Sequence, residues 1–153
     1  MIKHSHLPKS INILFVLSTI IFYLAVSGVY IASKIDAANI DSSISLKIFG
    51  WITISLIIPF TITLAGYVKA KARKKIIISH IFILSYLLLE VLLDYILKIK
   101  FRNILSLHIF YIAVFYAAAF SMIGVSRIIS RKIGIIVIAF FLILIGCLIY
   151  NLS

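Results

Sequence analysis

The chain has 153 residues and is strongly apolar, with 64% hydrophobic residues, 12% charged residues and a mean hydropathy of +1.25. Soluble domains carry about 25% charged residues, so this composition excludes an ordinary soluble domain and indicates an integral membrane protein. The formal net charge of +11 does not indicate a nucleic-acid partner, because Lys and Arg lie in short gaps between apolar runs rather than on one face of a folded domain.

Five apolar runs follow one another along the chain, and each is about as long as the roughly 20 residues that cross a bilayer as a helix. The first run follows a polar tail with Lys3 and Lys9, and its apolar core is longer than that of a signal peptide, which predicts an uncleaved span. The sequence therefore predicts an all-α fold, with one polytopic membrane domain over residues 1–153 and transmembrane helices at 11–33, 48–68, 76–97, 104–126 and 133–150.

The distribution of Lys and Arg between alternate loops predicts the orientation, because cytoplasmic loops retain positive charge. Ten of these residues lie in the N-terminal tail and in the loops around 69–75 and 127–132, and five lie in the remaining loops. We therefore expect a multi-pass protein of the cell membrane with a cytoplasmic N-terminus and an outer C-terminus.

Two carboxylates, Glu90 and Asp94, interrupt the third apolar run, "SYLLLEVLLDYILKIKFRN". Their spacing of four places them on one helix face with Lys98. A carboxylate in the hydrocarbon costs on the order of 2.5 to 3.5 kcal/mol by insertion scales, so we expect this face to avoid lipid. Two carboxylates one turn apart disfavour simultaneous ionisation, which favours the deeper Glu90 as a proton carrier.

A short loop joins the third and fourth spans, so we expect them to pack as an antiparallel hairpin with His108 at the depth of Asp94. The predicted site for a proton, ion or ligand is Glu90, Asp94, Tyr95, His108 and Tyr111, beneath a rim for anionic head groups formed by Lys98, Lys100 and Arg102. Three structural alternatives stay open: Asp94 pairs with Lys98 along the helix, Glu90 fixes helix packing, and the rim side chains snorkel.

The second span contains Pro59 within "ITISLIIPFTITLAG". Proline cannot donate to the carbonyl of Ser55, which predicts a helix kink. In the fourth span, Ala113, Ala117 and Ser121 recur at intervals of four, a pattern typical of close helix packing. Together with the small number of spans, this pattern favours a homo-oligomer or a larger membrane complex, in contact with membrane lipids.

Neither a cofactor nor a metal is predicted. Cys147 is the single cysteine, and His80 and His108 lie near opposite ends of their spans, so they cannot share a haem. The chain has no Walker loop, GxSxG elbow or HExxH motif, which weighs against an enzyme.

Three classes of function remain from the sequence. The first is a proton- or cation-linked transporter or channel-like protein with an intramembrane carboxylate site. The second is a non-catalytic membrane partner or assembly subunit whose carboxylates pair with another protein. The third is a membrane enzyme acting on a lipid head group. The sequence favours the first slightly over the second, because ionisable groups inside a membrane are expensive and mark functional sites by default.

Overall fold

A computed structural model describes residues 7–38, 43–98 and 104–152 of the chain. These residues are almost entirely helical, and no strand occurs within the described ranges. The elements, in chain order, are α1 (Lys9–Ala38), α2 (Ser43–Ser55), α3 (Ile57–Lys69), α4 (Lys74–Glu90), the π-helix η1 (Val91–Ile96), α5 (Leu105–Ile129) and α6 (Arg131–Leu152).

Five helical segments are long and apolar enough to cross a membrane: Lys9–Ile35, Ile44–Lys69, Lys74–Ile96, Leu105–Ile129 and Arg131–Leu152. The prediction of an all-α chain with five such helices is confirmed. Two spans consist of two elements each, α2 with α3 and α4 with η1.

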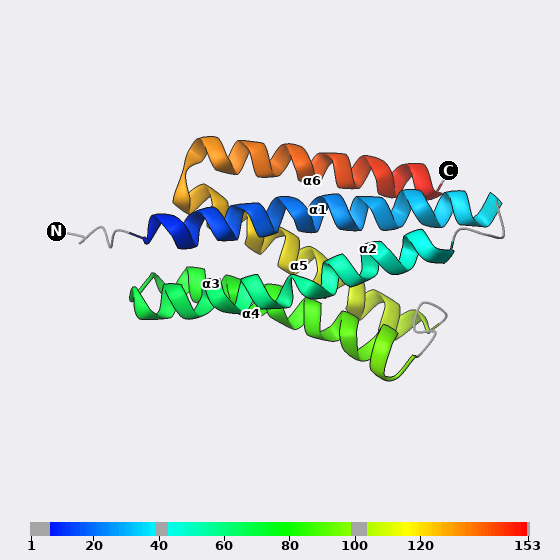
Figure 1. Ribbon diagram of the computed structural model, residues 1–153, viewed down its shortest axis with the longest axis horizontal. Helices are drawn as coiled ribbons and strands as arrows, with labels where there is room; N and C mark the ends of the chain where they lie inside the picture. The colour runs from blue at the N-terminus through cyan, green and yellow to red at the C-terminus, as the bar shows by residue number, and fades with distance from the viewer. Residues whose placement is uncertain (1–6, 39–42, 99–103, 153) are drawn as a thin grey trace.

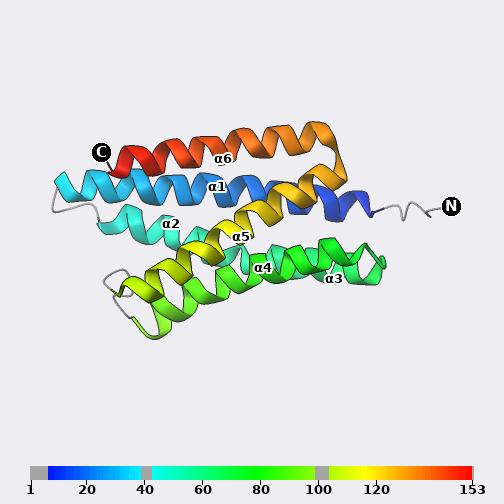
Figure 2. The same ribbon diagram turned by 180° about the vertical axis from the view of Figure 1, so that it is seen from behind.

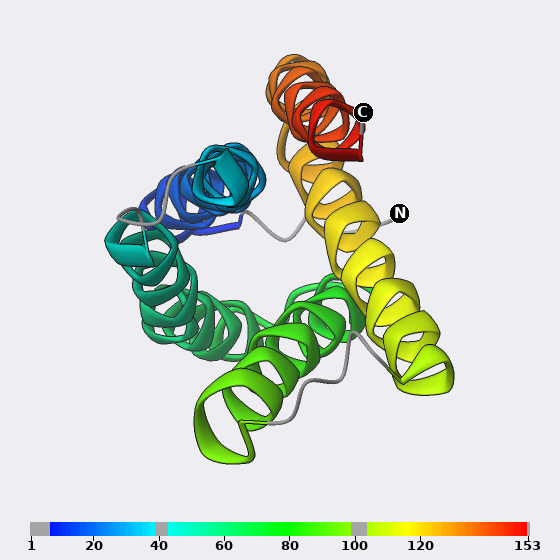
Figure 3. The ribbon, with the colours of Figure 1, turned by 90° about the vertical axis from the view of Figure 1, so that its right-hand side faces the viewer.

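The helices pack in a closed order around the bundle, which is seen end-on in Figure 3. Helix α1 contacts α2 and α3, α3 contacts α4, α4 contacts α5, α5 contacts α6, and α6 returns to α1. Seen from behind, α5 runs diagonally between α4 and α6 (Figure 2). The termini lie at opposite ends of the bundle (Figure 1), as an odd number of crossings requires.

The largest side chains of the bundle core are aromatic, and Ala, Val, Ile, Leu and Met fill the space between them. The largest fully buried side chains include Phe15, Phe22, Tyr23, Phe60 and Tyr67. The outer surface is apolar as well, with exposed Ile and Leu side chains on every helix, including Leu17, Ile58, Ile81, Leu105, Ile109 and Leu142. An apolar exterior around an aromatic core suits a helical bundle in lipid, where no hydrophobic effect separates core from surface.

The second span is divided near Pro59. Helix α2 ends at Ser55 and α3 begins at Ile57, with Leu56 forming a turn between them. The Leu56 amide donates to the carbonyl of Thr53 at 3.3 Å, which is a tighter turn than an α-helix. Pro59 has no amide to continue the helical bonding to Ser55, so the ladder is interrupted where the sequence predicts a kink.

Candidate functional site

Glu90 is the last residue of α4 and is half-buried against α5. The hydroxyl of Tyr111 donates a hydrogen bond to Glu90 Oε2. Tyr111 Oη in turn lies 2.9 Å from Tyr86 Oη, one turn deeper along α4. These three residues form a continuous hydrogen-bonded chain between two neighbouring helices, and we call it the Glu90 chain.

The direction of the Glu90 chain follows from the number of protons available. The Tyr111 hydroxyl has a single proton and donates it to the carboxylate. The proton between the two tyrosines must therefore come from Tyr86. With Glu90 ionised, every donor in the chain points toward the carboxylate.

Tyr86 places the inner end of the Glu90 chain in the aromatic core. Only 2% of Tyr86 is exposed. Its ring centroid lies 5.7 Å from that of Phe22 on α1 and 5.3 Å from that of Phe115 on α5, both in edge-on geometry. The chain therefore leads from a half-buried carboxylate into surroundings of aromatic rings.

The helix changes type directly after Glu90. Residues Val91–Ile96 form the π-helix η1, and the Leu97 amide donates to the Leu92 carbonyl five residues earlier at 2.8 Å. Short π-helical segments occur frequently at functional sites because they alter the direction of side chains. Asp94 lies half-buried within η1.

Lys98 follows the end of the helix rather than continuing it. Its backbone φ is 50°, in the left-handed region, and its side chain is exposed. The helical stripe predicted from Glu90 through Asp94 to Lys98 therefore stops before Lys98. The other two members of the predicted rim, Lys100 and Arg102, lie outside the described residues.

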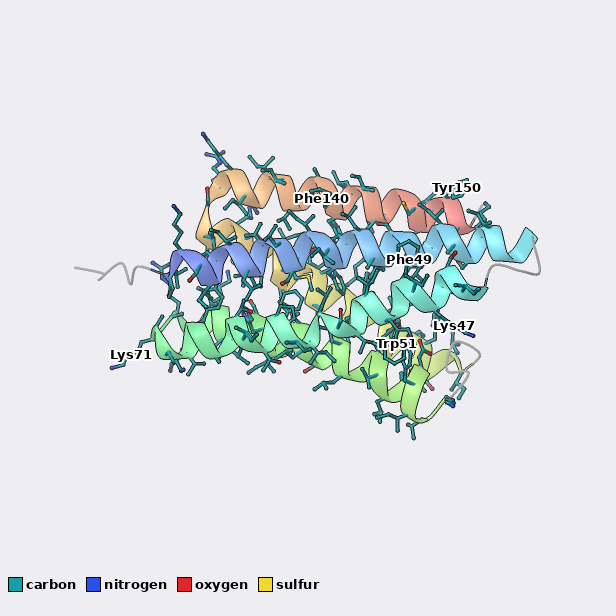
Figure 4. All side chains as sticks on the ribbon, viewed as in Figure 1. Lys47, Phe49, Trp51, Lys71, Phe140 and Tyr150 are labelled. Carbon is teal, nitrogen blue, oxygen red and sulfur yellow. The ribbon has the colours of Figure 1, made fainter. Side chains whose placement is uncertain are left out.

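Tyr95 belongs to a separate contact with the second span. Its ring lies 5.4 Å from that of Trp51, edge-on. A Cβ atom at Gly50 would lie 2.5 Å from Tyr95 Oη, so the absence of a side chain there lets the two helices approach. Tyr95 is still close enough to Glu90 and Asp94 to interact electrostatically with both. Figure 4 shows Trp51 on α2, on the side that faces this region.

His108 lies on the first turns of α5, three residues before Tyr111. Its Nδ1 atom is buried and has no hydrogen-bond partner among the described residues. Helices α4 and α5 are antiparallel. Asp94 lies about one turn from Glu90, and His108 about one turn from Tyr111, both toward the loop that joins the third and fourth spans. The structure thus joins Glu90 to Tyr111 directly and leaves His108 beside the chain.

A second polar cluster, not predicted from the sequence, surrounds His80 in the half of the bundle near the N-terminus. His80 is fully buried; its Nδ1 lies 2.9 Å from the Ile76 carbonyl and its Nε2 lies 3.2 Å from Thr63 Oγ1. Phe15 and Tyr67 cover the imidazole, with ring centroids 5.0 and 5.1 Å away. Both ring nitrogens lie within hydrogen-bonding distance of an oxygen atom, so this histidine is a core group that ties α4 to α3. Thr63 Oγ1 also donates to the Phe60 carbonyl at 2.9 Å.

Within the described ranges, no group of three or more His, Cys, Asp or Glu side chains is arranged to hold a metal ion. The chemistry of the site therefore depends on one hydrogen-bonded carboxylate, its two tyrosines and the neighbouring Asp94, Tyr95 and His108. Comparison with protein-family models, with curated proteins and with solved structures finds no match for this chain.

Proposed function

We propose that this protein is a proton- or cation-linked membrane transporter or channel-like protein in which Glu90 binds the proton or cation. The observation that supports the proposal most directly is the Glu90 chain, which connects a carboxylate within an apolar span to a buried hydroxyl of the core. Ionisable groups at such positions are costly and usually belong to ion or proton pathways.

The Glu90 chain can exist in two hydrogen-bonding states. When Glu90 is ionised, Tyr86 donates to Tyr111 and Tyr111 donates to the carboxylate. When Glu90 takes up a proton, it becomes a donor to Tyr111, which can then donate to Tyr86 instead. Every member of the chain keeps at least one hydrogen bond in both states, and the change needs only rotation of two hydroxyl groups. In the second state Tyr86 accepts, and its own proton no longer has an acceptor within the chain. This is the property expected of a group that gains and loses a proton repeatedly.

We further propose that the N-terminus faces the cytoplasm and the C-terminus faces the outside of the cell membrane. In this orientation the Glu90 chain opens toward the outer surface, with Lys98 above it as part of a rim for anionic head groups. The support is the unequal distribution of Lys and Arg between alternate loops, with ten in the N-terminal tail and the loops around 69–75 and 127–132 and five in the remaining loops. We also propose a homo-oligomer or a larger complex, because much of α6 remains exposed in the single chain.

The test is proton-linked flux in liposomes that contain the purified full-length protein and a pH-sensitive dye. We expect an imposed potential to drive acidification with the parent protein and not with Glu90→Gln, which keeps the shape of the side chain and removes its titration. Glu90→Asp is the matched control, because it keeps a carboxylate. Equal flux through the parent protein and Glu90→Gln at every pH would overturn the proposal.

The alternative, a non-catalytic assembly subunit, is supported by the same hydrogen bond viewed as a clamp between α4 and α5. That function predicts that Glu90→Gln, which can still accept from Tyr111, assembles like the parent protein. Glu90→Leu, which cannot accept, should lose a co-purifying membrane protein. The third class, an enzyme acting on a lipid head group, has less support, because within the described residues His108 Nδ1 is bonded to no carboxylate.

A further inference from the structure

The end of the bundle that carries the N-terminus is strongly basic. It comprises the start of α1, the turn between α3 and α4, and the turn between α5 and α6. We call it the basic end, and its exposed cations are Lys9, Lys69, Lys71, Arg73, Lys74, Lys75, Arg127, Arg131 and Lys132. The chain has only four acidic residues, and none of them lies in these three segments. This concentration of positive charge is therefore not balanced by carboxylates of the same segments.

Three helices begin at the basic end and two, α3 and α5, end there, so the helix dipoles add a small net positive charge. Helices α1, α4 and α6 all begin at the basic end, and none has an acidic residue in its first turn. Their first turns carry Lys9, Lys74 and Arg131 instead. Asp and Glu are the residues that normally stabilise a helix N-terminus, so these helix starts leave their partial positive charge for an external anion. Arg73, at the N-cap of α4, also makes no side-chain capping bond.

The turn between α3 and α4 holds its cations in a defined geometry. The Ala72 amide donates to the Tyr67 carbonyl at 2.9 Å, and the Lys71 amide donates to the Val68 carbonyl at 3.0 Å. This pair of bonds is the Schellman motif that ends many helices. Ala72 is buried and anchors the turn, whereas Lys71 projects from the end of the bundle (Figure 4).

Lys71 occupies the position of the Schellman motif that usually holds glycine. Its φ is 50°, in the left-handed region that is unfavourable for residues with a Cβ. A lysine at this position does not stabilise the turn. Its charge is exposed at the tip of the turn, where an external anion can reach it.

We propose that the basic end is a docking surface for anionic phospholipid head groups. The sign of the charge and its position at the helix ends both indicate an anionic lipid as the ligand. The cations lie at the end of five apolar helices, which is where lipid phosphates are found when such helices cross a bilayer, and basic clusters next to membrane spans bind anionic lipids. This inference concerns the opposite end of the bundle from the Glu90 chain and does not depend on transport.

The experiment measures binding of phosphatidylglycerol and of phosphatidylcholine to the full-length protein in detergent by native mass spectrometry. We expect phosphatidylglycerol to bind more tightly, with an advantage that falls as ionic strength rises. Lys71→Gly should weaken its binding by up to about fivefold, the factor that corresponds to one cation near an anionic surface. Replacement of Lys69, Lys71, Arg73, Lys74 and Lys75 together by Gln should weaken it by more than about tenfold.

Lys71→Gly separates charge from folding, because glycine is favoured at φ 50° and the variant should be at least as heat-stable as the parent protein. Lys47→Gln is the matched control, since it removes one exposed cation from the other end of the bundle (Figure 4) and should leave phosphatidylglycerol binding unchanged. The proposal is overturned if Lys71→Gly binds like the parent protein, if Lys47→Gln has the same effect, or if the two lipids bind equally. Equal binding of soluble glycerol phosphate would also overturn it, in favour of a soluble anion.

Discussion

Tyr111 and Glu90, which lie 21 residues apart in the sequence, are joined by a hydrogen bond between α5 and α4. The bond closes the hairpin formed by the third and fourth spans, and it satisfies a carboxylate in a chain that has few acidic groups. A single contact thus serves both the packing of two helices and the chemistry proposed for Glu90, and the two contributions can be separated by mutation.

Tyr111→Phe leaves the ring in place and removes both the donor to Glu90 and the acceptor of Tyr86. Because hydrogen bonds to charged groups are worth about 1.5 to 3 kcal/mol, we expect the free energy of unfolding to fall by at least that amount. Tyr86→Phe removes only a bond between two neutral hydroxyls and should cost about 1 kcal/mol. Reversible unfolding in mixed micelles measures both. Equal losses in the two variants would contradict a charged Glu90 as the acceptor.

Gly50 and Tyr95 offer a test of how closely the second and third spans approach. In Gly50→Ala, the new Cβ would lie 2.5 Å from Tyr95 Oη, so we expect a loss of about 1 to 3 kcal/mol. In Tyr95→Phe the hydroxyl is absent, and the next atom of the ring, Cζ, lies at 3.8 Å, an ordinary contact. In a protein that already carries Tyr95→Phe, Gly50→Ala should therefore hardly change the free energy of unfolding.

The same unfolding assay completes this double-mutant cycle, with Gly146→Ala as the control. A Cβ at Gly146 meets nothing within 4 Å, so that substitution should cause no loss of stability. If Gly50→Ala is equally harmful with Phe at position 95, the close approach between these two residues is wrong.

The helices could be predicted from the sequence because each span needs only a long apolar run, and hydropathy is a local property. The kink in the second span could also be predicted, because Pro59 removes a specific backbone donor. The π-helix η1 was not predicted. Its residues, Val91–Ile96, include neither Pro nor Gly, so nothing in the local sequence distinguishes them from an α-helix.

The site was harder to predict because its contacts join distant segments. The spacing of four residues identifies Glu90 and Asp94, and the hairpin adds Tyr111, but Tyr86 is not among the predicted site residues. The cluster around His80 was missed altogether. In this cluster Thr63 of α3 contacts His80, and Tyr67 covers the imidazole ring. Tyr67 also donates to Asn12, which lies 55 residues away in the sequence. No spacing rule within one helix reveals such a set.

Thr63→Val tests whether His80 depends on its side-chain partner. The substitution preserves shape and removes the hydroxyl, which leaves His80 Nε2 buried without a partner and should cost about 1 to 3 kcal/mol. Thr63→Ser keeps the hydroxyl and should lose less. Thermal unfolding of the two variants side by side makes the comparison, and identical melting temperatures would show that the bond at 3.2 Å contributes nothing.

Lys98 allows backbone strain and charge to be separated next to the proposed site. Lys98→Gly and Lys98→Ala remove the same cation, but only glycine relieves the left-handed φ of 50°. We expect the glycine variant to be more stable than the alanine variant by about 1 kcal/mol. Any binding of anionic lipid by the rim should fall equally in both. A more stable alanine variant in unfolding experiments would contradict the left-handed conformation.

Asn151 fastens the last turn of α6 to α1. Its Nδ2 donates to the carbonyl of Tyr30 at 2.7 Å and to Ser33 Oγ, two contacts that span most of the length of the chain. Beside it, Lys34 Nζ donates to the carbonyl of Tyr150, close to the end of α6 where a helix carries partial negative charge.

Asn151→Leu keeps the size of the side chain and removes both donors, so we expect a loss of about 1 to 2 kcal/mol in the free energy of unfolding. Because the contacts lie at one end of the helix, the loss should be local, and hydrogen exchange should accelerate at the last amides of α6 while those near Val137, which is fully buried, stay protected. Ser33→Ala, which removes only one of the two acceptors, should give a smaller acceleration at the same amides. Uniform acceleration along α6, or none, would show that Asn151 does not hold this end of the bundle closed.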